Sequence, residues 1–216
     1  MTRSLNETAA LCKRAARGAG LRWGIAEEAA WAARWLAGFG LPGPGALASL
    51  LAEHEIRGHA ALWVRTSSEV WRGESGALCP LSAGTALADC ARELGLSEGR
   101  EIRMHGVLQP LLLLPFAESA AEVLAHPVKL CWQGVQATCD GTLSIAEAEP
   151  GALGLSQADV TCCATSERGR AFAEQRLSRH TAPAQVWESL DRFARRTYAP
   201  ATEASRLLGA GAGDND

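Results

Sequence analysis

The order of hydrophobic periodicities along the chain constrains its fold more than any other sequence feature. Residues 1–58 carry apolar side chains at helical spacing, residues 60–165 are dominated by short strand-like runs, and helical spacing returns in residues 166–208. Helices followed by strands and then by helices are typical of an α+β fold. We therefore expect an N-terminal helical hairpin plus a third helix, a central mostly antiparallel or mixed sheet, and C-terminal helices.

The first 58 residues contain the clearest local signals. Ser4 followed by Glu7 predicts a capping box, in which each residue caps the other at the start of a helix. A second helix is expected over residues 25–37. The Pro-Gly-Pro-Gly run at residues 42–45 interrupts the chain, and a third helix is expected over residues 46–55.

The remainder of the chain is divided into shorter segments. We expect a hairpin around Ser67-Ser68, a helix over residues 83–94, a short helix over residues 118–125, and two later helices over residues 168–177 and 184–196. The predicted strands, in chain order, cover residues 101–105, 109–116, 128–133, 135–145 and 159–165.

Length and composition favour one folded domain. The chain has 216 residues, of which 47% are hydrophobic and 21% are charged, a composition typical of globular proteins. A domain of this size buries roughly 70% of the surface of its unfolded chain, so it needs no disulfide or metal for stability. We therefore expect a single domain over residues 1–216, with a Gly-rich tail at residues 209–216.

Charge and cysteine content predict the compartment and exclude two classes of partner. The net charge is −3 and Lys/Arg residues form no long cluster, which argues against nucleic acid. The longest aliphatic run, Leu111 to Leu114, is too short to span a membrane. The first residues show no signal-peptide or transit character, and the seven cysteines are an odd number, as expected of reduced thiols. We therefore expect a cytoplasmic protein that binds neither nucleic acid nor a membrane.

No residue pattern predicts a metal or a cofactor. Cys162 and Cys163 are adjacent, so on a strand they would point to opposite faces of the sheet. His54 and His59 are five residues apart, which is not a recognised ligand spacing. We therefore expect core cysteines, no metal site and no cofactor-binding residue, and the sequence names no cofactor.

Catalytic motifs are also missing from the sequence. There is no Gly-x-Ser-x-Gly elbow. A thiol–imidazole pair could combine Cys131 or Cys139 with His126 or His105, but nothing in their spacing brings them within hydrogen-bond reach. Whether the protein is an enzyme is therefore left open.

Two residues beside predicted turns are candidates for a pocket. Trp132 and Asp140 flank neighbouring strand segments, and Asp140-Gly141 is a turn signal. We favour a plain hairpin with Trp132 in the core, because tryptophan is usually buried. The other candidate pocket or tail residues are His105, Arg206, Asp214 and Asp216.

Several blocks of residues resemble a bacterial family, domain of unknown function 3726. The blocks are Ser-Leu-Asn-Glu at residues 4–7, residues 14–20, Trp23-Gly24, residues 26–29, residues 34–36 and the Gly-Ala segment at 209–213. The resemblance implies a stand-alone bacterial cytoplasmic protein of about this length, and it brings no activity with it. It also pairs the Gly-Ala tail with the N-terminal blocks, which predicts that the tail docks near the N-terminal helices.

A weaker resemblance concerns the first forty residues. Their helix–Gly–helix–Gly order is similar to the N-terminal region of the malate/L-lactate dehydrogenase family that is not of Rossmann type. In that family a catalytic Ser-His-Gly follows the second helix, whereas residues 40–45 contain no histidine. The similarity therefore implies at most a distant non-catalytic relative.

Two functions are compatible with these features. The first is an accessory or small-molecule-binding protein, working as a homo-oligomer or as the partner of an enzyme. The alternative is an enzyme acting on a small metabolite, with a pocket between the helical hairpin and the sheet that the C-terminal tail covers.

Overall fold

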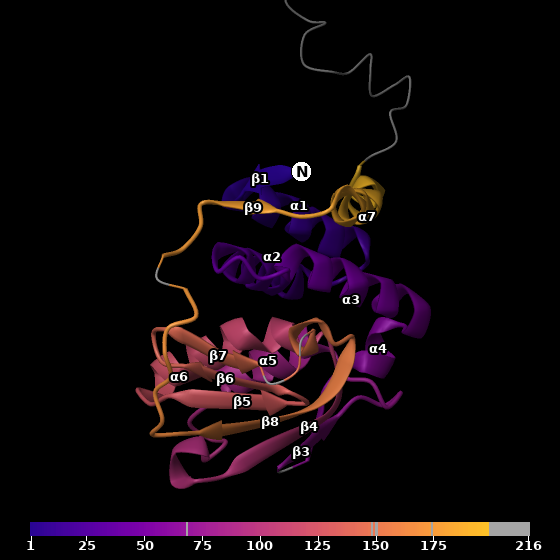
Figure 1. Cartoon of the computed structure of the whole chain (residues 1–216). Helices are drawn as coiled ribbons and strands as arrows, with labels where there is room; N and C mark the ends of the chain where they lie inside the picture. The colour runs from indigo at the N-terminus through magenta and orange to yellow at the C-terminus, as the bar shows by residue number, and fades with distance from the viewer. Residues whose placement is uncertain (68, 148, 150, 174, 199–216) are drawn as a thin grey trace, which may run out of the picture.

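Helices from both ends of the chain form one layer of the molecule. The computed structural model describes residues 1–67, 69–147, 149, 151–173 and 175–198. In Figure 1 the N-terminal helices and the last helix lie together above the sheet. The helices of this layer are α1 (Leu5–Gly18), α2 (Trp23–Gly38), α3 (Gly43–Arg57) and α7 (Ala184–Ala194).

A short two-stranded sheet joins the two ends of this layer. Strand β1 (Thr2–Ser4) pairs antiparallel with β9 (Arg179–Thr181), so that Arg3 lies opposite His180. The indole of Trp187 donates a hydrogen bond to the Met1 carbonyl over 2.9 Å, which links α7 to the same place. Neither strand was predicted from the sequence.

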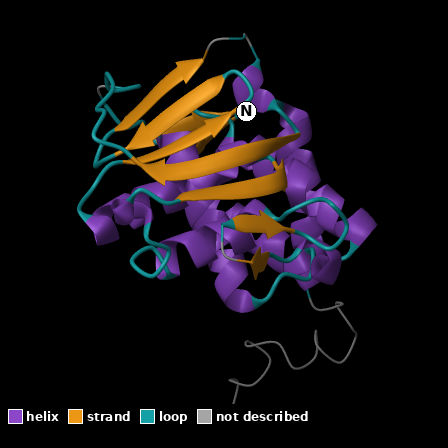
Figure 2. Cartoon of the chain, turned by 90° about the horizontal axis from the view of Figure 1, so that it is seen from below, coloured by secondary structure: helices purple, strands orange, loops and turns teal. Residues whose placement is uncertain are grey.

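The second layer is a seven-stranded sheet with helices on one face. Its strand order is β2-β3-β4-β8-β5-β6-β7, and all neighbouring pairs are antiparallel except β3–β4, so the sheet is mixed. Figure 2 views the sheet with the helices behind it. The strands are β2 (Arg65–Ser67), β3 (Val70–Arg72), β4 (Glu101–Leu108), β5 (Val128–Trp132), β6 (Val135–Cys139), β7 (Leu143–Glu147) and β8 (Gln157–Ala164).

Two helices lie between this sheet and the helical layer. They are α5 (Pro80–Asp89) and α6 (Leu114–Leu124), and both contact α2. One continuous buried core includes side chains from α1 to α3, from α5 and α6, and from the inner face of the sheet. The short elements are α4 (His59–Leu62) and the 3-10 turns η1 (Leu96–Glu98), η2 (Pro110–Leu113), η3 (Ala152–Gly154) and η4 (Arg195–Thr197). The α+β prediction, with N- and C-terminal helices and a mixed sheet, is confirmed.

The start of α1 follows the predicted capping box. The Ser4 amide donates to Glu7 Oε2 over 2.7 Å, and the Glu7 amide donates to Ser4 Oγ over 3.2 Å. Two donors that a helix start leaves free are thereby paired. The last turn of α1 packs directly against α7, because Gly18 has no Cβ and a Cβ there would overlap the Phe193 carbonyl.

The predicted strand at residues 109–116 is wrong. These residues form η2 and the start of α6. Gln109 takes a left-handed conformation with φ +47°, which turns the chain out of β4. The four leucines that follow are all buried, because η2 packs against helices and the sheet at once. An apolar stretch that is buried on every side shows no helical periodicity in its sequence, so the sequence pattern predicts a buried strand.

The predicted helix at residues 168–177 is wrong too. The described residues of this stretch form no regular element, and together with their neighbours they make an irregular connection from β8 to β9. We call residues 165–178 the connecting segment. Its backbone is held by partners outside the segment: the Phe172 amide donates to the Leu143 carbonyl over 2.6 Å and the Leu177 amide to the Gly38 carbonyl over 2.7 Å. These tertiary hydrogen bonds replace the local ones that a helix would make.

Several boundaries differ from the sequence prediction. Residues 135–145 form two strands, β6 and β7, that reverse at the Asp140-Gly141 turn. The predicted hairpin around Ser67 exists, but it is shorter than expected because residues 59–62 form α4. Among the described residues, no helix is both long enough and apolar enough to cross a bilayer.

Candidate functional site

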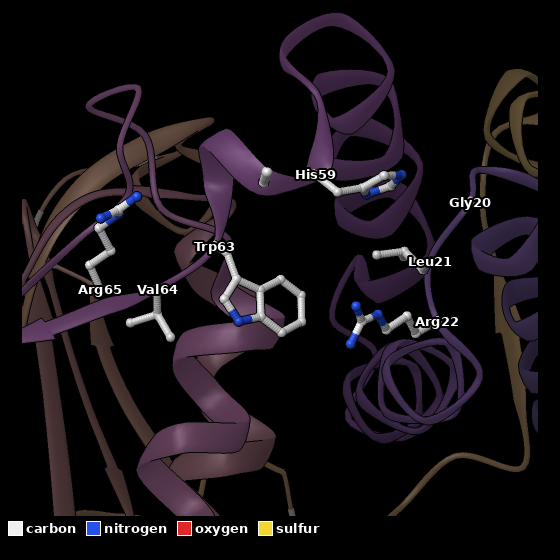
Figure 3. Close-up of a pocket in the computed structure, with 8 residues that line it drawn as sticks. Gly20, Leu21, Arg22, His59, Trp63, Val64 and Arg65 are labelled. Atoms are coloured by element: carbon white, nitrogen blue, oxygen red, sulfur yellow. The ribbon is translucent and has the colours of Figure 1, made fainter.

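A candidate pocket lies where the α1–α2 turn faces α4 and the start of β2. Its volume is about 620 Å³. We call it the basic pocket, and its lining includes Leu21, Arg22, His59, Trp63, Val64 and Arg65. In Figure 3 the Arg22 side chain and the Trp63 indole extend into the space between the two segments from opposite sides.

Of the described residues, the charged side chains that line the basic pocket are arginines, and no carboxylate lines it. Arg65 forms an ion pair with Glu74 over 3.1 Å, but both side chains are exposed, so the pair is weak. No ion pair joins Arg22 to a residue that the structure describes. The pocket therefore offers positive charge without a strong internal counterion.

The beginning of α2 adds to this positive potential. Arg22 is the N-cap residue of α2, yet its side chain makes no capping hydrogen bond, and the first turn contains no acidic residue. The free amide N–H groups and the helix dipole therefore favour an anion at this end. Helix α2 begins at Trp23, two residues before its predicted start, so Glu27 and Glu28 lie beyond its first turn.

A chain of hydrogen bonds leads from the wall of the basic pocket into the core. His59 Nε2 lies 3.0 Å from the Ala19 carbonyl, His59 Nδ1 lies 2.9 Å from His54 Nδ1, and His54 Nε2 lies 3.2 Å from Cys79 Sγ. A carbonyl only accepts, so His59 Nε2 carries a proton and donates it. A neutral His59 then accepts at Nδ1 from His54, and His54 accepts at Nε2 from the Cys79 thiol.

Burial keeps His54 and Cys79 of this chain uncharged. His54 is 2% exposed, and its burial, followed by the neighbouring His59, lowers the pKa of its imidazole to about 4. Cys79 is fully buried, and this burial raises the pKa of its thiol to about 11. At neutral pH the pair is therefore a neutral imidazole and a thiol. A reactive thiolate needs a lowered pKa and an exposed position, so Cys79 is not an activated nucleophile.

Sequence reasoning examined His54 and His59 only as metal ligands and missed their contact. Gly58, with φ +79°, ends α3 between them and turns the chain, which brings the two imidazoles together. A histidine in the last turn of a helix, followed by glycine and a second histidine, is the signal that could have indicated the pair. Within the described residues, no three His, Cys, Asp or Glu side chains are grouped so that they could hold a metal ion.

The structure does not bring Trp132 and Asp140 together. Trp132 lies beside the β5–β6 turn, is 5% exposed, and donates from Nε1 to the Ala152 carbonyl over 3.1 Å. Asp140 lies at the other end of β6, where its Oδ1 accepts from the Thr142 hydroxyl over 2.6 Å. Trp132 thus occupies the core position of a hairpin, and neither residue lines the basic pocket.

The other predicted pocket residues lie elsewhere. His105 is exposed on β4, with Nδ1 3.2 Å from Asp159 Oδ2. Arg206, Asp214 and Asp216, and with them the predicted lid, lie outside the described residues.

The thiol–imidazole pairs that were considered from the sequence do not form in the described part of the chain. Cys139 is buried and its Sγ contacts the Leu114 carbonyl over 3.6 Å, whereas His126 is exposed. The seven cysteines are all free, and four of them are buried. Cys162 is buried while Cys163 is half-buried, as expected for neighbours on opposite faces of β8.

The comparison with known protein families gives one match. Residues 3–97 match the model of a family described as "Protein of unknown function (DUF3726)". No curated protein matches the chain. The match ends before the Gly-Ala segment at 209–213, so that part of the resemblance lies outside it. It includes all lining residues of the basic pocket together with His54 and Cys79, and over this part the chain resembles that family of unknown function.

Proposed function

We propose that the protein binds a small organic anion in the basic pocket. The ligand class is a molecule with one carboxylate or phosphate group and an apolar body. The observation that carries the proposal concerns Arg22, the N-cap residue of α2, which lines the pocket. Among the described residues, Arg22 has no ion-pair partner and no carboxylate lines the pocket.

The two parts of the ligand would meet different groups. A guanidinium donates two parallel hydrogen bonds to a carboxylate or phosphate, so Arg22 would hold the anionic end beside the first amides of α2. The Trp63 side chain is 40% exposed and would cover the apolar end. A few polar groups in a mostly apolar cleft are typical of small-molecule sites.

The state of His59 favours binding over proton-transfer catalysis. Both ring nitrogens are held by protein groups, Nε2 by the Ala19 carbonyl and Nδ1 by His54. A general base needs a free nitrogen within reach of its substrate. In this proposal His59 is a rigid wall of the pocket, whose ring orientation is fixed by the hydrogen bonds behind it.

The proposal extends to the setting of the protein. The free cysteines support a cytoplasmic location, and the residue blocks between positions 4 and 36 that resemble a bacterial family support a bacterial origin. An accessory role, as a homo-oligomer or beside an enzyme, would use the bound anion as a signal or as cargo.

Isothermal titration calorimetry with three matched probes tests the proposal. Phenyl phosphate and benzoate are expected to bind, whereas benzamidine, of the same shape but positively charged, is not. Arg22→Gln should weaken binding of the anions by about tenfold or more, the usual effect of losing a charge-assisted hydrogen bond. Arg14→Gln removes an exposed arginine of α1 outside the pocket and should leave binding unchanged. Equal binding of benzamidine, or equal effects of the two substitutions, would refute the proposal.

A further inference from the structure

A second cavity lies between the end of α2, helix α6, the β6–β7 turn and the connecting segment. Its volume is about 380 Å³. Four side chains in its lining carry the argument: Trp35 and Phe39 from α2, Glu118 from α6, and Arg176 from the connecting segment. We call it the mixed-charge cavity, because the carboxylates of Glu118 and Glu122 and the guanidinium of Arg176 line it together. It shares no lining residue with the basic pocket.

Glu118 is a buried carboxylate in which one oxygen has no hydrogen-bond partner among the described residues. The side chain is 9% exposed, and its Oε1 accepts from the Gly141 amide over 2.9 Å. Its Oε2 is buried and has no hydrogen-bond partner among the described residues. Buried polar atoms are nearly always paired, and leaving one unpaired is costly. An unpaired acceptor on a residue that lines a cavity therefore indicates a donor that the described part of the chain does not supply.

Arg176 provides the opposite charge in the same cavity. Its Cζ lies 3.6 Å from the ring centroid of Phe39 and 4.9 Å from that of Trp35, so the guanidinium rests on both aromatic rings. No hydrogen bond or ion pair joins the guanidinium to another described residue, Glu118 included. The charge of Glu118 nevertheless raises the pKa of Arg176, against the larger lowering by burial, so the two groups are electrostatic neighbours.

The position of Arg176 is fixed by its backbone. The next amide, that of Leu177, donates to the Gly38 carbonyl at the end of α2 over 2.7 Å. A guanidinium that contacts an aromatic ring through its carbon can still donate its N–H groups to a carboxylate. The cavity thus presents an acceptor for a cation and a set of donors for an anion, held apart by the fold.

A ligand that satisfies both groups must carry both charges. A simple cation would pair with Glu118 but leave Arg176 without an acceptor, and a simple anion would leave the Glu118 oxygen unpaired. We propose that the mixed-charge cavity binds an α-amino acid with an apolar side chain. Its ammonium group pairs with Glu118, its carboxylate pairs with Arg176, and its side chain lies against Trp35.

The pKa of Glu118 supports this assignment. Burial is the main cause that raises it, and the nearby carboxylates of Glu122 and Asp140 raise it further, against the lowering by the Gly141 amide. A cation placed beside Glu118 would stabilise the ionised carboxylate. Binding an ammonium group therefore relieves a cost that the folded chain otherwise carries.

Calorimetry on the full chain tests the proposal with L-leucine and L-phenylalanine as probes. Each is compared with the analogues that lack one charged group: isopentylamine and 4-methylpentanoate for leucine, phenethylamine and 3-phenylpropionate for phenylalanine. We expect at least one of the two amino acids to bind, and both of its analogues to bind about tenfold more weakly or worse, because each leaves one charged group unpaired.

Two substitutions locate the site and two serve as controls. Glu118→Gln keeps an oxygen for the Gly141 amide but removes the charge, and Arg176→Gln removes the guanidinium; each should weaken binding by about tenfold or more. Arg170→Gln lies in the same connecting segment but outside the cavity, and Arg22→Gln changes only the basic pocket; neither should alter amino-acid affinity. A thermal melt of each variant confirms folding.

Three results would overturn the proposal. The first is that neither amino acid binds at about 10 mM, a concentration that would reveal even weak sites. The second is that the amine analogue binds as tightly as its parent amino acid. The third is that Arg170→Gln loses as much affinity as Arg176→Gln.

Discussion

The buried imidazole of His54 should make the stability of the protein depend on pH in a defined direction. In the folded protein the pKa of His54 is lowered from 6.5 to about 4, because the ring is buried and lies next to His59. In the unfolded chain the ring takes up its proton near pH 6.5. As the pH falls, the unfolded state is therefore protonated first. The stabilising contribution is complete above pH 6.5 and is lost as the pH falls towards 4.

The magnitude follows from the two pKa values. One pKa unit corresponds to about 1.4 kcal/mol, so the full difference is worth about 3 kcal/mol. Since His54 is only 2% exposed, solvent screening takes little from this figure. Between pH 8 and pH 5 the expected loss is about 2 kcal/mol, because pH 5 still lies above the pKa of the folded state.

Urea unfolding followed by tryptophan fluorescence measures this loss at pH 8, 7, 6 and 5. His54→Gln keeps polar atoms near Cys79 and His59 but cannot titrate, so its free energy of unfolding should fall by about 2 kcal/mol less than that of the wild type over this range. Carboxylates and His180 titrate in both proteins, and their contributions cancel in the comparison. His126→Gln, at an exposed histidine, controls for the loss of one ring. Parallel pH profiles for wild type and His54→Gln would show that His54 is not held neutral by the fold.

Two further substitutions test packing and thiol exposure. Gly84→Ala should lower the free energy of unfolding by about 1–3 kcal/mol, because its Cβ would overlap the Phe116 ring, whereas Gly24→Ala, with no atom within 4 Å of the new Cβ, should be neutral or stabilising in the same urea assay. A chromogenic disulfide reagent should modify Cys90 fastest, because Cys90 is the exposed cysteine, and Cys90→Ser should remove the fast phase; if that phase persists, another thiol is accessible. The thiols that should react only on unfolding are Cys12, Cys79, Cys139 and Cys162.

Local signals in the sequence predict the helical layer well. The Ser4–Glu7 capping box places the start of α1, and Gly58 places the end of α3, because both act through atoms within a few residues. Residues 109–116 and 168–177 were misassigned because tertiary contacts decide their structure. Nothing local indicates that Gln109 adopts φ +47° or that the Leu177 amide pairs with the Gly38 carbonyl.

The two candidate sites could not be predicted from the sequence either, because tertiary contacts form them too. The basic pocket depends on Arg22 and Trp63, and the mixed-charge cavity on Trp35, Glu118 and Arg176, which are separated by tens of residues. Each side chain has an ordinary local context, and only the fold brings them together. Trp132 and Asp140 were chosen as candidates because they are close in sequence. In the structure Trp132 lies on β5 opposite the first residue of β6, whereas Asp140 follows the last residue of β6.

The pairing of β1 with β9 has a consequence for biosynthesis. The ribosome completes α1 and β1 long before their partners, because β9 and α7 begin only at residues 179 and 184. Until then, the face of α1 that receives α7, including Gly18, has nothing to pack against. The helical layer can therefore close only after the intervening sheet has been synthesised. A nascent chain that stops before residue 179 would expose this apolar face, which makes such products natural targets for chaperones and proteases.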